Sequence, residues 1–161
     1  MQKKLFPLFI IVLIALGGLY YYQHYVAAPT IKFNELKLKT TDGTTFDFYS
    51  LKGKKTIVFM YASWCGECRK EQAAVSKILE QLSGVTIICI SDEPMEKVID
   101  FSQKMQYPFT YVKMEQGFNS IGIYSIPVTY FVNTNLEVVD EKLGFIQWDD
   151  PATVKYLKGL L

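Results

Sequence analysis

The feature that most constrains the fold is an apolar run that leads directly into two closely spaced cysteines. Residues 56–61 are apolar enough for a buried strand, and a helical pattern follows from Cys68 onward. Cys65 and Cys68 therefore lie at a strand-to-helix turn, with Cys65 at its exposed edge. Free N–H groups and the positive end of the helix dipole favour a thiolate there. The sequence predicts redox chemistry with Cys65 as the nucleophile and Cys68 as its partner.

The predicted helix buries one of its faces. Cys68, Glu71, Val75, Ile78 and Leu82 recur at helical spacing and share that face. A carboxylate turned toward a core has a raised pKa and can carry a proton to or from sulfur. Glu71 is therefore the third candidate catalytic residue.

This stretch resembles the thioredoxin-like thiol:disulfide oxidoreductases, and most closely their membrane-anchored ResA/TlpA branch. That branch is associated with extracytoplasmic thiol reduction and cytochrome c maturation. The resemblance runs from about Phe33 to the end of the chain. It is carried by Trp64-Cys65-Gly66-Glu67-Cys68, by Arg69-Lys70-Glu71 and by Ser125-Ile126-Pro127-Val128-Thr129.

The resemblance implies a thioredoxin fold, an α/β domain whose central mixed β-sheet is flanked by helices on both faces. It also implies an N-terminal β-hairpin, an insert before the second half of the domain, and a cis bond at Pro127 beside the cysteines. A glutamate at the position of Glu71 is a trait of this family. Thioredoxin has a buried aspartate where this chain has Phe59, so Glu71 is left as the main internal acid.

Candidate substrate-binding residues surround the cysteine pair. They are Trp64, Gly66, Glu67, Ile126 and Pro127. The backbone of Ile126 would pair with an extended substrate segment by strand addition. Trp64 fits a place in the core and a place on the substrate surface equally well. The carboxylate of Glu67 opposes thiolate formation, which predicts a more reducing pair than in strong oxidants.

The remaining patterns predict a strand–helix–strand unit around the cysteines, with a right-handed crossover and parallel strands. Pro94 is expected at the first position of a second helix. The other expected elements are a hairpin of residues 35–39 and 44–48, a strand over 85–90, an extended piece over 107–112, a short helical turn over 116–124, a hairpin of residues 128–132 and 136–140, and a last helix from 151 to 161.

The start of the chain is a separate segment. Residues 5–22 carry no charge, and about 18 residues at 1.5 Å each just span a bilayer core. We expect a cytoplasmic tail (1–4), a transmembrane anchor (5–22), a linker (23–32) and a thioredoxin-like domain (33–161). A cleaved signal peptide is the alternative, although Pro29 is a poor residue after the possible cleavage pattern Val26-Ala27-Ala28. Lys3 and Lys4 favour a cytoplasmic N-terminus, while lysines beyond the apolar run weaken that bias.

The low net charge and the small number of cysteines and histidines argue against nucleic-acid binding and against a metal site. A net charge of +1 creates no strong field for nucleic acid. No metal site is expected, because the remaining cysteine, Cys89, lies in an apolar strand and the one histidine, His24, lies at the membrane end. The expected redox centre is the Cys65–Cys68 disulfide itself, with no bound cofactor.

The sequence thus predicts a single-pass membrane protein whose catalytic domain, outside the cytoplasm, reduces protein disulfides. Its partners would be protein thiols and disulfides, with a membrane electron-transfer protein as its reductant. Two alternatives stay open. One is an oxidase or isomerase of secreted proteins, which would share every motif. The other is a tethered Cu(I) metallochaperone, for which a third ligand is missing.

Overall fold

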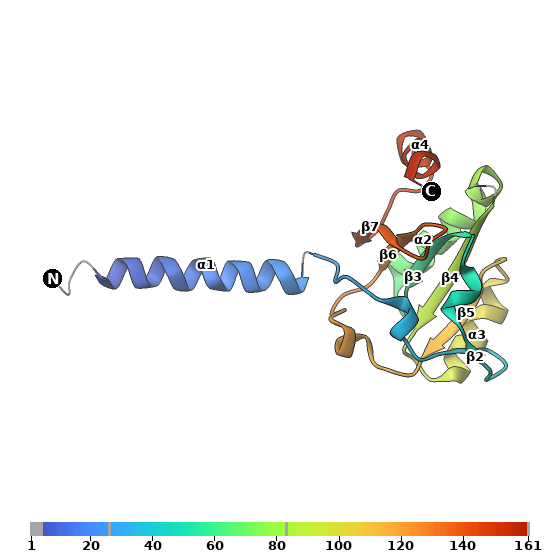
Figure 1. Cartoon of the computed structure of the whole chain (residues 1–161), viewed down its shortest axis with the longest axis horizontal. Coiled ribbons are helices and arrows are strands. Elements are labelled where there is room, and N and C mark those ends of the chain that lie inside the picture. The colour runs from blue at the N-terminus through green and yellow to red at the C-terminus, as the bar shows by residue number, and fades with distance from the viewer. Residues whose placement is uncertain (1–4, 26, 83, 161) are drawn as a thin grey trace.

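A long helix and an α/β domain make up the chain. The computed structural model describes residues 5–25, 27–82 and 84–160. Helix α1 (Leu5–Tyr25) stands clear of the domain that contains the other elements (Figure 1). The predicted cytoplasmic tail (1–4), Val26 of the possible cleavage pattern and Leu161 of the last helix lie outside the described residues.

The domain is built on a seven-stranded mixed sheet in the order β2-β1-β5-β4-β3-β6-β7. The pairs β3–β4 and β4–β5 are parallel and the others antiparallel. The strands are β1 (Leu38–Thr40), β2 (Thr45–Phe46), β3 (Lys55–Met60), β4 (Val85–Ser91), β5 (Thr110–Met114), β6 (Val128–Val132) and β7 (Val138–Leu143). The helices are α2 (Gly66–Ile78), α3 (Met95–Met105) and α4 (Pro151–Leu160), with 3₁₀ helices η2 (Phe33–Glu35), η3 (Phe48–Leu51), η4 (Leu79–Leu82) and η5 (Phe118–Ile121).

The two faces of the sheet are covered differently. Helices α2, α3 and α4 share one apolar core, which includes Val75 and Leu157 and which we call the α2 core. The opposite core, which includes Phe33 and Phe118, is closed by η2, η3 and η5. The prediction of helices on both faces is corrected: the three α-helices of the domain lie on one face. The segments on the other face are single 3₁₀ turns of three or four residues, too short for an α-helix.

The N-terminal hairpin and the insert are confirmed. Strands β1 and β2 pair around a turn in which Gly43 has φ +85°. They are shorter than predicted, because Glu35 and Phe48 belong to 3₁₀ helices. The insert between β4 and β6 contributes α3 and β5, and β5 lies between β1 and β4 in the sheet. The predicted parallel strand–helix–strand unit is β3–α2–β4.

Three element boundaries differ from the prediction. Pro94 is the N-cap of α3, with extended backbone angles, and not its first helical residue. Strand β7 begins at Val138, because Leu136 has φ +69° and belongs to the turn. Helix α2 ends at Ile78, so Leu82 of the buried stripe lies in η4.

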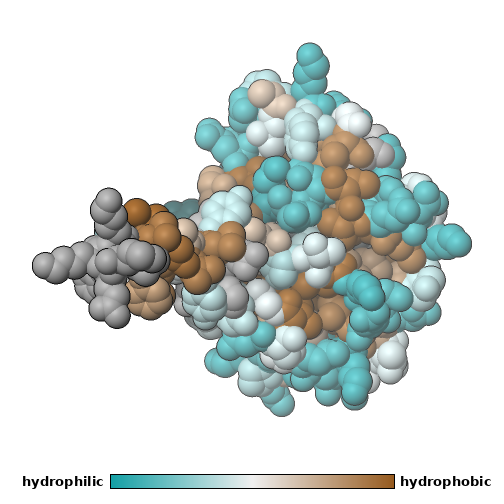
Figure 2. Space-filling view, turned by 60° about the vertical axis from the view of Figure 1, so that its left-hand side comes forward, coloured by the Kyte–Doolittle hydropathy of each residue, from teal (hydrophilic) through white to brown (hydrophobic). Residues whose placement is uncertain are grey.

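Helix α1 exposes apolar side chains along its described length, and the part of it that is not grey in Figure 2 is largely brown. Its side chains are described for residues 7–22. Among the described residues, no helix is both long and apolar enough to cross a membrane.

Part of the predicted linker packs on the domain. Ile31 is buried, and the hydroxyl of Tyr130 donates a hydrogen bond of 2.8 Å to the carbonyl oxygen of Pro29. A Cβ on Gly122 would lie 3.4 Å from the Pro29 side chain. The linker therefore packs on the domain from Ala28 onward.

Candidate active site

Cys65 and Cys68 form a disulfide, with the two Cα atoms 5.3 Å apart. Cys65 is the N-cap of α2, and its Sγ accepts a hydrogen bond of 3.1 Å from the backbone N–H of Cys68. Cys65 is 7% exposed and Cys68 is 1% exposed. The geometry therefore provides an N–H donor that stabilises a thiolate at Cys65, the more accessible sulfur.

The face of α2 behind the disulfide is buried as the spacing predicted. Glu71, Val75 and Ile78 are all buried, whereas Arg69 and Lys70 are exposed. Cys68 and Glu71 are three residues apart on this face, which places their side chains on neighbouring turns.

Glu71 is fully buried, and one of its oxygens is held by two donors. Its Oε1 accepts hydrogen bonds from the indole Nε1–H of Trp148 (3.0 Å) and from the backbone N–H of Ile146 (3.1 Å). Burial raises the pKa of Glu71 from 4.5 to about 7, against the lowering effect of the bonds from Trp148 and Ile146 and of the nearby Thr129 hydroxyl. A carboxyl with this pKa can both accept and release a proton near neutral pH.

The other oxygen of Glu71 has a different environment. Thr129 lies near this carboxyl and lowers its pKa. Yet neither Oε2 of Glu71 nor Oγ1 of Thr129 has a hydrogen-bond partner, although both atoms are buried. Thr129 is opposite Phe59 in the pairing of β6 with β3, so it projects into the α2 core beside Glu71.

The peptide bond between Ile126 and Pro127 is cis, which confirms the prediction. Pro127 is buried, and its carbonyl oxygen accepts a hydrogen bond of 2.8 Å from Gly144 N–H. Within the described part of the chain, Ile126 makes no backbone hydrogen bond, so its N–H and C=O are available to an extended segment.

Trp64, Gly66 and Glu67 form the exposed rim of the site. Trp64 is 73% exposed, so a place in the core is wrong for this residue. The carboxylate of Glu67 forms an ion pair of 2.7 Å with Lys70, and both side chains are more than half exposed. A cavity of about 180 Å³ lies between Trp64, Ile126 and Phe118 of η5, so it is bordered by the residue before Cys65 and by the residue before the cis-proline.

A carboxylate from the loop after β4 holds the turn that carries the disulfide. The backbone N–H and the hydroxyl of Ser63 both donate to Glu93, and the hydroxyl of Ser91 donates to it at 3.3 Å. Ser63, two positions before Cys65, is therefore fixed by two hydrogen bonds to one side chain, and Ser91 holds that side chain with a third.

Phe59 and Cys89 line the α2 core below the site. Phe59 packs edge-on against Trp148, with ring centroids 5.6 Å apart. Cys89 is fully buried, and burial raises the pKa of its thiol well above the ordinary value, as expected for an inert core cysteine. Among the described residues, no three histidine, cysteine or acidic side chains are placed to hold a metal.

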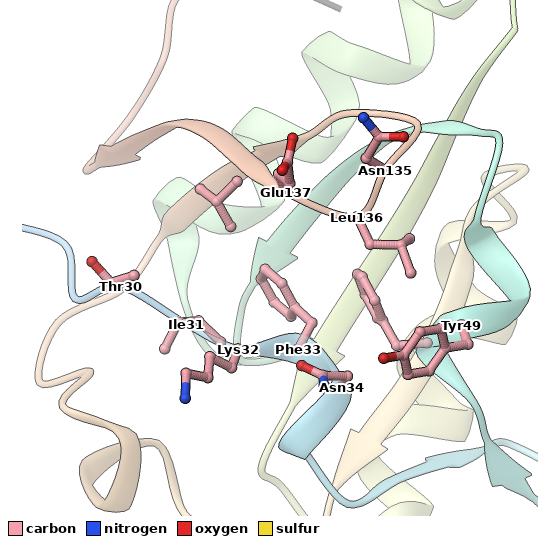
Figure 3. Close-up of a pocket in the computed structure, with 11 residues that line it drawn as sticks. Thr30, Ile31, Lys32, Phe33, Asn34, Tyr49, Asn135, Leu136 and Glu137 are labelled. Carbon is pink, nitrogen blue, oxygen red and sulfur yellow. The ribbon is translucent and has the colours of Figure 1, made fainter.

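A larger cavity, of about 330 Å³, lies away from the cysteines and is lined by residues 30–34, 48–49 and 135–138. Phe33 and Leu136 belong to the core opposite the α2 core, and Lys32 points away from the cavity (Figure 3). None of its lining residues is a cysteine, so it is not the site of thiol exchange.

Sequence reasoning missed Trp148, the Ile146 amide and the Ser63–Glu93 pair. No spacing rule connects position 148 with position 71. Thr129 could have been predicted from the sequence. It lies two positions after Pro127 in the motif that carries the resemblance, and the residues on either side of it, Val128 and Tyr130, face the opposite core.

Comparison with known proteins agrees with this geometry. The model of the AhpC/TSA family matches residues 29–140, a span that includes the disulfide, Glu71 and the cis-proline. The chain belongs to the AhpC/TSA family. This family match covers more than half of the chain and begins where the linker packs on the domain.

The curated relatives of this chain include thioredoxin-like and thiol:disulfide interchange proteins. The thioredoxin-like protein YneN of Bacillus subtilis is 26% identical over 156 residues, which cover 89% of this chain and 91% of the relative. The thiol:disulfide interchange protein DsbE of Pseudomonas fluorescens biotype C is 28% identical over 133 residues, covering 77% and 73%. The crystal structure of StoA from Bacillus subtilis has a TM-score of 0.57 at 23% identity, covers 83% of this chain and 98% of that one, and shows the shared fold. With the Cys65–Cys68 pair, these findings place the chain among the thioredoxin-like thiol:disulfide oxidoreductases.

Proposed function

We propose that α1 anchors this oxidoreductase in the cell membrane and that its domain reduces protein disulfides outside the cytoplasm. The observation that carries the chemistry is the Cys65–Cys68 disulfide at the start of α2, with the buried carboxyl of Glu71 one turn further on. A more exposed sulfur, a fully buried partner sulfur and an internal proton acceptor are the parts that dithiol exchange needs.

Reduction of a substrate then follows two steps. The Cys65 thiolate, stabilised by the N–H of Cys68, attacks one sulfur of the substrate disulfide, and the first substrate thiolate leaves. The Cys68 thiol passes its proton to Glu71 and attacks the Cys65 sulfur of the mixed disulfide. The second substrate thiolate leaves, and the Cys65–Cys68 bond re-forms. The substrate gains two electrons and this chain loses two.

The rim of the site supports a polypeptide substrate. An extended segment can pair with the open backbone of Ile126, while Trp64 and Phe118 border the cavity that Ile126 also lines. Such a segment would present its disulfide to Cys65. Gly66 is exposed and has no side chain to obstruct that approach.

A reductant outside the cytoplasm must be recharged, and a membrane electron-transfer protein is the proposed donor. The resemblance to the ResA/TlpA branch makes oxidised apocytochrome c the first substrate to test. The uncharged run of residues 5–22 and the exposed apolar side chains of α1 support membrane attachment. The full chain should sediment with membranes after a high-salt wash, and a version that begins at Ala27 should be released.

The reduction potential of the Cys65–Cys68 pair tests the direction of electron flow. The full chain in detergent is equilibrated with dithiothreitol or glutathione buffers, and its free thiols are counted. A potential near or below about −270 mV, that of thioredoxin, is expected for a dedicated reductant. A potential near about −120 mV, as in strong oxidants, would contradict this direction and assign the chain to oxidation of secreted proteins.

A further inference from the structure

The carboxyl of Glu71 is held asymmetrically. Oε1 accepts two N–H donors, from Trp148 and from Ile146, whereas Oε2 is buried without a hydrogen-bond partner. Trp148 is itself fully buried and packs against Phe59 and Phe131, so its indole N–H is fixed in direction. An indole N–H can only donate, as can a backbone N–H.

We propose that Trp148 is a positioning residue that assigns different tasks to the two oxygens of Glu71. It holds Oε1 as a permanent acceptor and leaves Oε2 as the atom that takes the proton of Cys68 and later returns it. The inference rests on the proposed function, because it concerns the proton that dithiol exchange releases.

The chemical reason lies in which oxygen can bear hydrogen. A proton on Oε1 would point at two N–H groups that cannot accept it, so two hydrogen bonds would be lost inside the core. A proton on Oε2 disturbs neither bond. It can also be donated to the nearby hydroxyl of Thr129, whose Oγ1 has no partner in the present state.

Thr129 suits both protonation states of this carboxyl. A hydroxyl donates to an ionised Oε2 and accepts from a protonated one after its hydrogen rotates. Trp148 and Ile146, in contrast, donate to Oε1 in both forms and bind the ionised form more strongly. The site therefore combines two fixed donors on one oxygen with one adaptable hydroxyl near the other.

The proton transfer balances within the exchange reaction. The S–H bond of Cys68 breaks and an O–H bond forms at Oε2, which leaves a Cys68 thiolate and a neutral carboxylic acid. The thiolate then attacks the Cys65 sulfur of the mixed disulfide and expels the substrate thiolate. When the membrane donor reduces the Cys65–Cys68 bond again, the same O–H bond breaks and the proton returns to Cys68.

Other titratable groups near Glu71 bear on its pKa. On its own helix, the charge of Glu67 raises it, and Cys68 joins this set once the disulfide is reduced. From β4, the thiol of Cys89 interacts with Glu71 but stays protonated because burial raises its pKa. The test therefore uses the oxidised protein, in which Cys65 and Cys68 do not titrate.

The first measurement is the pH titration of Glu71 in the full, oxidised chain, by ¹³C NMR of glutamate carboxyls assigned with Glu71→Gln. We expect Trp148→Phe to raise the pKa by about one unit, because the anion loses one of its two fixed donors. Phe131→Leu is the matched control: it disturbs the packing around Trp148 without removing a donor, and should leave the pKa unchanged. An unchanged pKa in Trp148→Phe, or an equal shift in Phe131→Leu, overturns the proposal.

Infrared spectroscopy identifies the protonated atom. If the proton is on Oε2, the C=O group of the acid is C–Oε1 and accepts the Trp148 bond, so Trp148→Phe must raise its stretching frequency. If the proton is on Oε1, the C=O group is C–Oε2 and the frequency stays the same, which contradicts the assignment. The band is identified by its absence in Glu71→Gln.

A third measurement keeps Trp148 in place, in case Trp148→Phe folds poorly. The chain has two tryptophans, so in Trp64→Phe the tryptophan emission reports Trp148 alone. We expect this emission to titrate with the pKa of Glu71 and to lose that titration in Trp64→Phe/Glu71→Gln. A titration that persists without Glu71 overturns the proposal. None of these readouts depends on the reduction potential. They therefore test the role of Trp148 even if the protein oxidises its substrates instead of reducing them.

Discussion

The two cores on either side of the sheet differ in whether their buried polar atoms have hydrogen-bond partners. Among the described residues, four buried side-chain atoms lack a hydrogen-bond partner, and all four belong to residues of the α2 side: Tyr61 Oη, Glu71 Oε2, Gln72 Nε2 and Thr129 Oγ1. In the opposite core, Phe33 stacks on Phe48 with centroids 4.7 Å apart, and the one tyrosine hydroxyl, of Tyr130, donates to Pro29.

Unpaired buried polar atoms cost stability, and folded proteins keep few of them. All four lie on the side of the sheet that α2 covers, and two of them, Glu71 Oε2 and Thr129 Oγ1, are the atoms to which we assign the proton transfer. The opposite core consists of apolar side chains and of polar groups that have hydrogen-bond partners. Substitutions that act on one core and not on the other test this difference.

The largest effect is expected from Glu71→Gln on the pH dependence of stability. The pKa of Glu71 is about 7 in the folded protein and 4.5 ordinarily. As pH rises from 4.5 to 7, the unfolded chain therefore releases this proton first, and the free energy of unfolding falls. The full loss, present above pH 7, is about 3 kcal/mol.

Glutamine has no proton to release, so Glu71→Gln should lose this slope while other carboxyls contribute equally to both proteins. Denaturant unfolding of the oxidised proteins at several pH values between 4 and 8 measures it. If the free energy of unfolding has the same pH dependence in both proteins, burial does not raise the pKa of Glu71 in the folded state.

A pair of tyrosines gives a smaller and more direct contrast between the two cores. Tyr130→Phe removes a hydroxyl that donates to the Pro29 carbonyl, and should cost about 1 kcal/mol. Tyr61→Phe removes a buried hydroxyl without a partner, and should be neutral or stabilising. The same atom is deleted in each variant, and urea midpoints compare them. Equal losses would contradict the difference between the cores.

The sequence predicted what depends on local pattern. Hydrophobic periodicity was enough to place Cys68, Glu71 and Val75 on one buried face and Cys65 at the start of α2. The cis bond at Pro127 came from the family resemblance, because nothing in the local pattern distinguishes cis from trans.

What periodicity could not predict is the partner across a core. It shows that Glu71 is buried, but the donor that meets it lies 77 positions later at Trp148, and Glu93 lies 30 positions after Ser63. The covering of the sheet was missed for a related reason. The short helical turn expected over 116–124 is present as η5, but local pattern did not show on which face of the sheet each helix would lie.

The smallest effect is expected at the rim, from Glu67→Gln. From the sequence, the charge of Glu67 was expected to make the pair more reducing, but the structure shows an exposed ion pair with Lys70 that offsets this charge. Exposed pairs of this kind contribute about 0.3–0.5 kcal/mol, and about 1.4 kcal/mol corresponds to 30 mV for a two-electron couple. Glu67→Gln should therefore make the pair more oxidising by only about 10 mV.

Lys70→Gln is the matched control and should shift the potential in the opposite direction by a similar amount, because it leaves Glu67 unpaired beside the cysteines. Redox equilibration at low and high salt measures both variants, and screening should reduce each shift. A shift of several tens of millivolts that persists in high salt would mean that Glu67 acts on the sulfurs directly. The rim would then have to be grouped with the α2 core, as a region where charge is placed for redox chemistry.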